Sequence, residues 1–290
     1  MTLSKQRYSQ QPEASAWASS ENGSGPGSLY VIQLSDLHLF AQPEGQLLGV
    51  ATEETFCSVL AETQSYLHDL DFILLTGDLS QDGSPQSYAR LREHLSSLSI
   101  EAYWIAGNHD QLDPMSLELE GAGLNSDKVF NRQNWTFILM NTLQPGREWG
   151  VLSPEALQML YSHLQVAQAL GTHVLISLHH PPFHVGSAWL DQTALQQPET
   201  FFQVLDQFDH IRLVLCGHIH QDHHCQRHGV DYLSCPSTCF QFKPASDSFR
   251  LDLIPPGFRQ LWLYPDGNYT TSIQRVPAGL QYPNLSLSGY

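Results

Sequence analysis

The chain has 290 residues, of which 41% are hydrophobic and 14% are charged, a composition typical of a globular protein. Its formal net charge of −16, with histidines neutral, argues against a nucleic-acid-binding surface. The same charge would repel a phosphate substrate unless bound cations reversed the local field. We see no run of 18 apolar residues and no secretory signal, so we expect a cytoplasmic protein without a membrane partner.

The five cysteines are an odd number without a CxxC pair, which favours reduced thiols over a disulfide framework. Residues 1–28 are rich in Ser, Gln, Gly and Glu, and we predict a disordered leader there. We expect a single domain over residues 29–275 and a loose C-terminal tail over residues 276–290.

Apolar and β-branched runs predict strands in the first three quarters of the domain, at 29–34, 72–76, 101–105, 135–140, 173–178 and 211–216. Helical spacing predicts helices between them, at 53–67 with Thr52 as a possible N-cap, from Ser84-Pro85 to Leu95, and from Ser153-Pro154 to Leu164. This alternation of strands and helices implies a parallel sheet with right-handed crossovers.

The pattern changes after Asp222 to short strands separated by turns, at 229–234, 249–253, 259–264 and 269–273. Residues 265–268, Pro-Asp-Gly-Asn, predict a hairpin turn between the last two. We take 211–216 as the last clear parallel-type strand. These segments suggest a second, antiparallel layer that completes a sandwich.

Five of the predicted strands end in residue types that bind metals: Asp36 and His38, Asp78, Asn108 and His109, His179, and His218 and His220. Each group alone has a simpler explanation, such as a helix cap, a Gly-Asn turn or a solvated loop. Together they are not an expected by-product of core packing. Because the carboxyl ends of parallel strands lie along one edge, we expect these side chains to form one cluster.

Without His109, this set still offers seven oxygen or imidazole ligands, which exceed what one ion needs, so it indicates two metal ions. The Asp78 carboxylate can bridge two cations. His218 and His220 are roughly 6–7 Å apart on an extended chain, so each can serve a different ion. Cys216 is expected to be a buried core thiol, and a ligand set without thiolate argues against structural zinc. We expect two divalent or mixed-valence ions, with Fe or Mn preferred and Zn as the alternative.

In this order the motifs resemble the calcineurin-like metallophosphoesterases: Asp36-x-His38, Gly77-Asp78, Gly107-Asn108-His109-Asp110, His179 and Gly217-His218-x-His220. The resemblance implies an α/β fold, specifically a four-layer α/β/β/α sandwich. Further stretches resemble the bacterial class III 3′,5′-cyclic-AMP phosphodiesterases, at 36–41, 47–50, 189–192, 216–221, 236–244 and 254–259.

The resemblance also implies a role for each site residue. One metal would be held by Asp36, His38, Asp78 and His220, and the other by Asp78, Asn108, His179 and His218. His109 would face the phosphate as a catalytic residue together with Asp78, whereas His180 would pack or support. The substrate-binding residues would be His38, Asp78, Asn108, His109 and His220.

The implied reaction is hydrolysis of cyclic AMP to 5′-AMP by a hydroxide that bridges the metals, which would lower cellular cyclic AMP. His109 would stabilise or protonate the leaving 3′ oxygen. Other cyclic nucleotides, other phosphodiesters and a non-catalytic metal-binding regulatory role are the alternatives, and the chain could be a monomer or a homodimer. Trp189 and the Ser237-Thr238 loop could lie near the nucleotide or serve only in packing.

Overall fold

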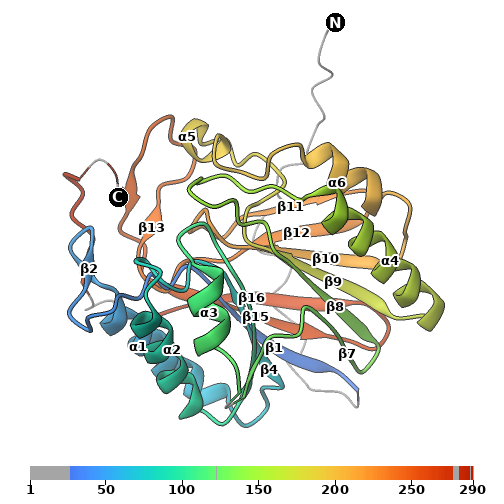
Figure 1. Cartoon of the computed structure of the whole chain (residues 1–290), viewed down its shortest axis with the longest axis horizontal. Coiled ribbons are helices and arrows are strands. Elements are labelled where there is room, and N and C mark those ends of the chain that lie inside the picture. The colour runs from blue at the N-terminus through green and yellow to red at the C-terminus, as the bar shows by residue number, and fades with distance from the viewer. Residues whose placement is uncertain (1–26, 122, 277–280, 288, 290) are drawn as a thin grey trace, which may run out of the picture.

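The computed structural model describes residues 27–121, 123–276, 281–287 and 289 (Figure 1). The predicted leader therefore lies outside the described residues, apart from Gly27 and Ser28, and the predicted domain boundaries stay predictions. The described chain forms two six-stranded mixed sheets, packed face to face with helices on both outer sides.

The first sheet has the strand order β16-β15-β1-β4-β5-β6. Its strands are β1 (Leu29–Leu34), β4 (Phe72–Thr76), β5 (Glu101–Ile105), β6 (Leu124–Asn125), β15 (Gly257–Leu263) and β16 (Tyr269–Arg275). Strands β1, β4, β5 and β6 are parallel, and β15 pairs antiparallel with both β1 and β16.

The second sheet has the strand order β11-β12-β10-β9-β8-β7. Its strands are β7 (Val129–Arg132), β8 (Trp135–Met140), β9 (His173–Leu178), β10 (Ile211–Cys216), β11 (His224–Arg227) and β12 (Val230–Ser234). Strands β8, β9, β10 and β12 are parallel, and β7 and β11 form the antiparallel edges.

The helices and the short remaining elements lie between these strands in sequence. They are β2 (Gln46–Leu47), β3 (Val50–Ala51), α1 (Thr52–Thr63), η1 (Gln64–Tyr66), α2 (Pro85–Ser96), α3 (Leu112–Glu118), α4 (Pro154–Leu170), α5 (Ala188–Asp191), α6 (Pro198–Leu205), β13 (Gln241–Phe242) and β14 (Leu251–Asp252). Ser84 and Ser153 cap α2 and α4 with their hydroxyls, and a proline is the first residue of each helix, as predicted.

Three apolar cores separate the four layers, with α1–α3 on one outer side and α4 and α6 on the other (Figure 1). Strand β1 shows how one sequence serves two cores. Ile32 faces the helices α1–α3, whereas Val31 faces the second sheet. Side chains alternate along a strand, so a strand covered on both faces needs a continuous apolar run. The predicted α/β class and four-layer sandwich are confirmed.

Two predictions about topology were wrong. The parallel strands belong to two sheets, and the strands after Asp222 form no layer of their own. Strand β12 pairs parallel with β10, so β10 is not the last parallel strand, while β15 and β16 extend the first sheet. Apolar runs identify strands, but they do not say which distant strands pair.

One prediction about a helix end was also wrong. Thr52 is the first helical residue of α1, and Ala51 occupies the N-cap position without a side-chain cap. The side chain of Thr52 is buried, so its place is set by packing at the start of the helix. The predicted hairpin at 265–268 is confirmed, because Gly267 N donates to Tyr264 O at 3.0 Å.

Candidate metal centre

The residues that follow the carboxyl ends of the strands, here called the strand exits, have unusual backbone conformations. Five residues there have left-handed backbones: Asp36 with φ 55°, His38 with 51°, Asp78 with 49°, His218 with 70° and His220 with 49°. For a residue with a side chain this region costs free energy, on the order of 1–3 kcal/mol each, and such strain concentrates at functional sites. These left-handed conformations turn the side chains toward one point at the ends of the two sheets.

Hydrogen bonds tie the exits of the two sheets together. Asp36 N donates to Gly77 O at 3.0 Å within the first sheet. Across the sheets, His218 N donates to both carboxylate oxygens of Asp36, at 3.0 and 3.2 Å. His109 N donates to Asp78 Oδ1 at 2.9 Å. Both buried carboxylates are therefore oriented by backbone amides of other strand exits.

Two glycines allow this close approach. A Cβ on Gly107 would overlap the Asp78 carboxylate, and one on Gly77 would overlap the His179 ring. Gly77 also has φ +96°, where residues with side chains are strained. These glycines are needed because the carboxylate and the imidazole lie against the backbone.

Four imidazoles are oriented by oxygen partners on one side of each ring. His179 Nδ1 donates to Thr76 O at 2.8 Å, and His220 Nδ1 donates to Phe240 O at 2.9 Å. His38 Nδ1 lies 2.7 Å from Gln81 Oε1, which can only accept. In the neutral form of each of these three rings, Nε2 has a lone pair that faces the site.

His218 is oriented in the opposite sense. Its Nε2 lies 2.8 Å from Thr193 Oγ1, and that hydroxyl donates its own proton to Leu190 O at 2.9 Å. Thr193 must therefore accept from His218, which leaves the lone pair on Nδ1. His218 Nδ1 lies 3.0 Å from Asn108 Oδ1, so two acceptors face each other.

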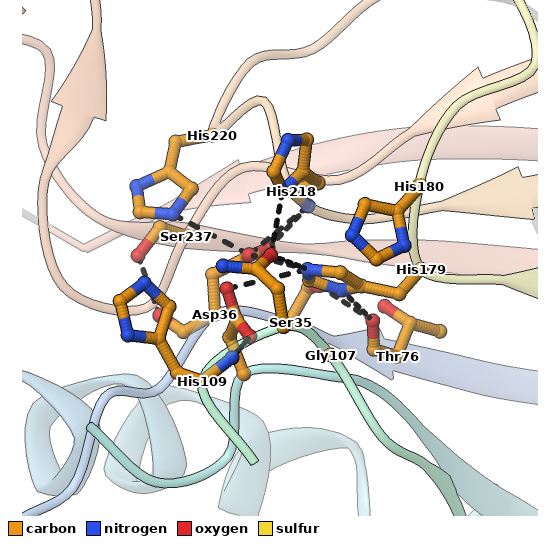
Figure 2. A network of polar contacts seen from close by, with 12 residues as sticks. Ser35, Asp36, Thr76, Gly107, His109, His179, His180, His218, His220 and Ser237 are labelled. Atoms are coloured by element: carbon orange, nitrogen blue, oxygen red, sulfur yellow. Dashed lines mark hydrogen bonds and ion pairs between the residues drawn. The ribbon is translucent and has the colours of Figure 1, made fainter. Parts of the chain in front are cut away.

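The ring nitrogens that face the site converge on the carboxylates in two adjoining groups. In one group, His38 Nε2 and His220 Nε2 are 3.2 Å apart, and His220 Nε2 is 3.4 Å from Asp36 Oδ1. In the other, His179 Nε2 is 3.2 Å from Asp78 Oδ2 and 3.3 Å from Asn108 Oδ1. Figure 2 shows His179 and His220 turned toward Asp36.

This donor set fits metal cations. Facing lone pairs repel one another unless a proton or a cation lies between them, and the buried environment strengthens that repulsion. Imidazole nitrogens with carboxylate and amide oxygens suit Fe, Mn or Zn. All seven ligands expected from the sequence are thus brought together, and the potential metal-binding groups include Asp36, His38 and His220, and also Asp36, Asp78 and His179.

The carboxylates are charged despite their burial. Burial raises the pKa of Asp36, but His220 and His179 more than offset this, so its pKa lies below the usual range. Burial likewise raises the pKa of Asp78, and His179 and His109 reverse the effect and hold it well below its usual range. Burial lowers the pKa of His38 to about 3, which keeps this imidazole neutral. Burial lowers the pKa of His179, but Asp78 more than offsets this and raises it to about 9. Metal binding requires charged carboxylates and neutral imidazoles, so a bound cation would take the place of the proton on His179.

Of the adjacent histidines, the geometry favours His179 as the ligand. Its Nε2 faces Asp78 and Asn108, whereas His180 Nδ1 lies 2.8 Å from Thr142 Oγ1 and its ring lies beside that of His218, 4.8 Å between centroids. His180 also lies within metal-binding distance of His179 and His218, so its supporting role stays a prediction. His109 is half-buried, and its ring lies edge-on to that of His38 at 5.1 Å.

Sequence reasoning missed the residues that hold the ligands in place. Asp110 is fully buried and accepts from Gly107 N and Ser80 N, both at 2.9 Å, which ties the Asp78 exit to the 107–110 loop. Burial and the charge of Asp78 raise the pKa of Asp110 to about 6. The place of Asp110 in the Gly-Asn-His-Asp motif could have indicated its role from the sequence. No sequence feature indicated the role of Thr193, because it lies outside every motif.

The predicted nucleotide neighbours differ in their surroundings. Ser237 is buried, and its hydroxyl donates to Asp36 O at 2.7 Å, so it supports the first strand exit. Trp189 lines a cavity beside Asn108 and His109. A position of Ser237 and Thr238 near the nucleotide stays a prediction.

Comparison with known proteins agrees with this geometry, since residues 29–222 match the family described as calcineurin-like phosphoesterase. The chain belongs to the calcineurin-like phosphoesterase family. The fold of this family carries a dinuclear metal centre, and the converging His and Asp groups of this phosphoesterase fit one.

Two relatives cover most of this phosphoesterase. It is 44% identical to a 3′,5′-cyclic-nucleotide phosphodiesterase of Nostoc sp., over 89% of this chain and 97% of the relative. It is 40% identical to the 3′,5′-cyclic adenosine monophosphate phosphodiesterase CpdA of Vibrio vulnificus, over 91% of this chain and 96% of the relative.

Solved structures share the fold of this phosphoesterase at low identity. A purple acid phosphatase from yellow lupin superposes with a TM-score of 0.64 at 13% identity, covering 88% of this chain and 53% of that one. A dimetal phosphatase from Danio rerio superposes with a TM-score of 0.60 at 15% identity, covering 86% and 99%. Among the described residues, no helix is both long and apolar enough to cross a membrane.

Proposed function

We propose that this phosphoesterase hydrolyses 3′,5′-cyclic AMP to 5′-AMP and thereby lowers cellular cyclic AMP. The observation that carries the proposal is the buried set of converging donors, with half-buried His109 at its side. The relatives named as 3′,5′-cyclic-nucleotide phosphodiesterases support the substrate class, because they match this chain along nearly their whole length.

Each of the two donor groups would hold one cation. Asp36, His38, Asp78 and His220 would hold the first, and Asp78, Asn108, His179 and His218 the second. When bound, two divalent cations would neutralise the phosphodiester and lower the pKa of water at the site toward neutrality. Fe, Mn and Zn all suit mixed imidazole and carboxylate ligands. Of these, we propose Fe or Mn, with Zn as the alternative.

The side chains of the protein have separate tasks around the phosphate. Asp78 would be shared by the two cations, and its orientation is fixed by the amide of His109. His109 would donate a proton to the leaving 3′ oxygen or a hydrogen bond to the phosphate. It suits this role because its backbone is anchored to Asp78 while its ring borders the cavity beside the site.

The test is turnover of a substrate panel together with metal analysis of the purified protein. The panel contains cyclic AMP, cyclic GMP, a 2′,3′-cyclic nucleotide and bis-p-nitrophenyl phosphate. We expect about two metal ions per chain and the highest kcat/KM for cyclic AMP. Turnover of bis-p-nitrophenyl phosphate without turnover of any 3′,5′-cyclic nucleotide would contradict the proposed substrate. A cytoplasmic location and the choice between monomer and homodimer stay predictions.

A further inference from the structure

A cavity of about 230 Å³ adjoins the metal centre, and its lining includes Asn108, His109 and His218. A phosphate held by the metal centre would therefore have the rest of its molecule beside or inside this cavity. The remaining lining residues come from segments that have no part in holding metal. They show what kind of group the cavity accepts.

Three aromatic side chains, Trp189, Phe242 and Phe249, line the cavity. The Trp189 ring meets Phe242 edge-on at 4.9 Å and Phe249 at 5.2 Å, and the two phenylalanines are 5.7 Å apart. Phe242 also stacks on His220 at 4.3 Å. These contacts hold the aromatic corner in fixed relation to the donor set, so it can receive a flat ring at a defined place.

One short segment serves both the cavity and the metal centre. Trp189 lies on α5, and Thr193, two residues after the end of that helix, accepts the proton of His218 Nε2. Thr193 also lines the cavity. The five residues from Trp189 to Thr193 therefore link the position of the Trp189 ring to that of the His218 ring.

Glu148 is the one carboxylate among the described residues that line the cavity. It is exposed, and a free carboxylate beside a phosphate site opposes anion binding. The opposition is offset if the bound molecule presents an N–H group to it. The exocyclic amine of adenine is such a group, because it donates hydrogen bonds and carries no negative charge.

We propose that this cavity is the nucleobase subsite, with Trp189 and Phe249 packing against the base and Glu148 accepting from its exocyclic amine. The inference rests on the proposed function, since it assumes a nucleotide whose phosphate lies at the metal centre. Beyond that function, it assigns the residues that determine which base is bound. Proteins bind bases on aromatic rings because every base has a π-face, and polar groups at the rim then discriminate among bases.

The first experiment compares three ligands by calorimetry on the metal-loaded protein: 5′-AMP, ribose 5-phosphate and inorganic phosphate. We expect 5′-AMP to bind more tightly than ribose 5-phosphate, and Trp189→Ala to weaken 5′-AMP alone, by about 5- to 150-fold. Trp189→Phe should restore most of the loss. Trp262→Ala is the matched control, since Trp262 stacks on Tyr30 in the first sheet, and it should change no affinity.

The outcomes separate this inference from the proposed function. Equal affinity of the wild type for 5′-AMP and ribose 5-phosphate, with normal turnover of cyclic AMP, would overturn the subsite and leave the function intact. Failure to turn over cyclic AMP would overturn the function. A Trp189→Ala protein that loses phosphate binding to the same extent would also overturn the subsite, because the effect would then be structural.

The second experiment tests Glu148 with 3′,5′-cyclic IMP, which has a carbonyl where cyclic AMP has the amine. Glu148→Ala should raise the KM for cyclic AMP by about tenfold, the usual worth of one hydrogen bond to a charged group. The KM for cyclic IMP should stay the same or fall. An equal rise for both substrates would overturn the assignment of Glu148 to the amine.

Discussion

Among the described residues, the metal centre and a cluster between α1 and α2 both bring carboxylate and imidazole within metal-binding distance, but they surround these groups differently. In the cluster between α1 and α2, His94 Nε2 lies 2.6 Å from Glu53 Oε1, and Arg90 Nε donates to Glu53 Oε2 at 2.7 Å. Cys57 lies beside this pair, so the group could also hold a metal by distance alone. Here, however, the charges of the protein already satisfy one another.

The metal centre leaves its donors facing one another instead. His38 Nε2 and His220 Nε2 are 3.2 Å apart, and Nδ1 of each ring contacts an oxygen outside the site. The backbones differ as well, since Glu53 and His94 lie in regular helices whereas His38 and His220 have left-handed φ values. Proximity alone therefore does not define a metal site. Several imidazole nitrogens and carboxylates that converge on one point, held on strained backbone, define it better.

The largest expected effect follows from removing the shared carboxylate. Asp78→Ala should lose both metal and activity, because Asp78 belongs to both donor groups. Turnover of cyclic AMP should fall on the order of a thousandfold or more. Elemental analysis checks the metal content and a coupled assay the rate. Normal metal content in this variant would disprove the bridging role of Asp78.

His109→Ala separates catalysis from metal binding. Its backbone amide, which orients Asp78, is retained, so metal content should stay as in the wild type. Turnover should fall about 10²- to 10⁴-fold, the usual contribution of a positioned acid. Loss of metal in proportion to activity would show that His109 acts as a ligand instead.

Thr193→Val tests whether a neutral hydroxyl fixes the ring of His218. The substitution keeps the shape of the side chain but removes the acceptor for Nε2–H, so the imidazole can rotate or change tautomer. We expect about a 10- to 100-fold loss in affinity for one of the two ions, measured by titration with a chelator. Thr200→Val on α6 is the control, because the Thr200 hydroxyl donates only locally to Gln197 O. Equal behaviour of the two variants would contradict the role of Thr193.

The comparison also explains what could be predicted from the sequence. The proposed ligands Asp36, Asp78 and His218 could be found because each lies two residues after the end of an apolar strand, and strand ends meet at one edge. Thr193 and Gln81, which orient the rings of His218 and His38, could not be found in this way, since their roles depend on contacts between distant segments. The division into two sheets was missed for the same reason, because β1 pairs with β15 across more than 220 residues. Local periodicity carries no information on such pairings.

The smallest effect is a pH dependence of stability in the ion-paired cluster. The contacts of His94 with Cys57 and Glu53 outweigh burial and raise the pKa of His94 to about 9. A raised pKa stabilises the fold fully below the unfolded value of about 6.5, and this contribution is lost as the pH rises through 9. His94→Gln should therefore lower the free energy of unfolding at pH 6 by about 1–2 kcal/mol and have less effect at pH 9.5, measured by urea denaturation. His68→Gln, which replaces a histidine whose side chain is 96% exposed, is the control for losing an imidazole. Metal content should be unchanged in His94→Gln, and a loss of one metal ion would instead make the α1–α2 cluster a metal site.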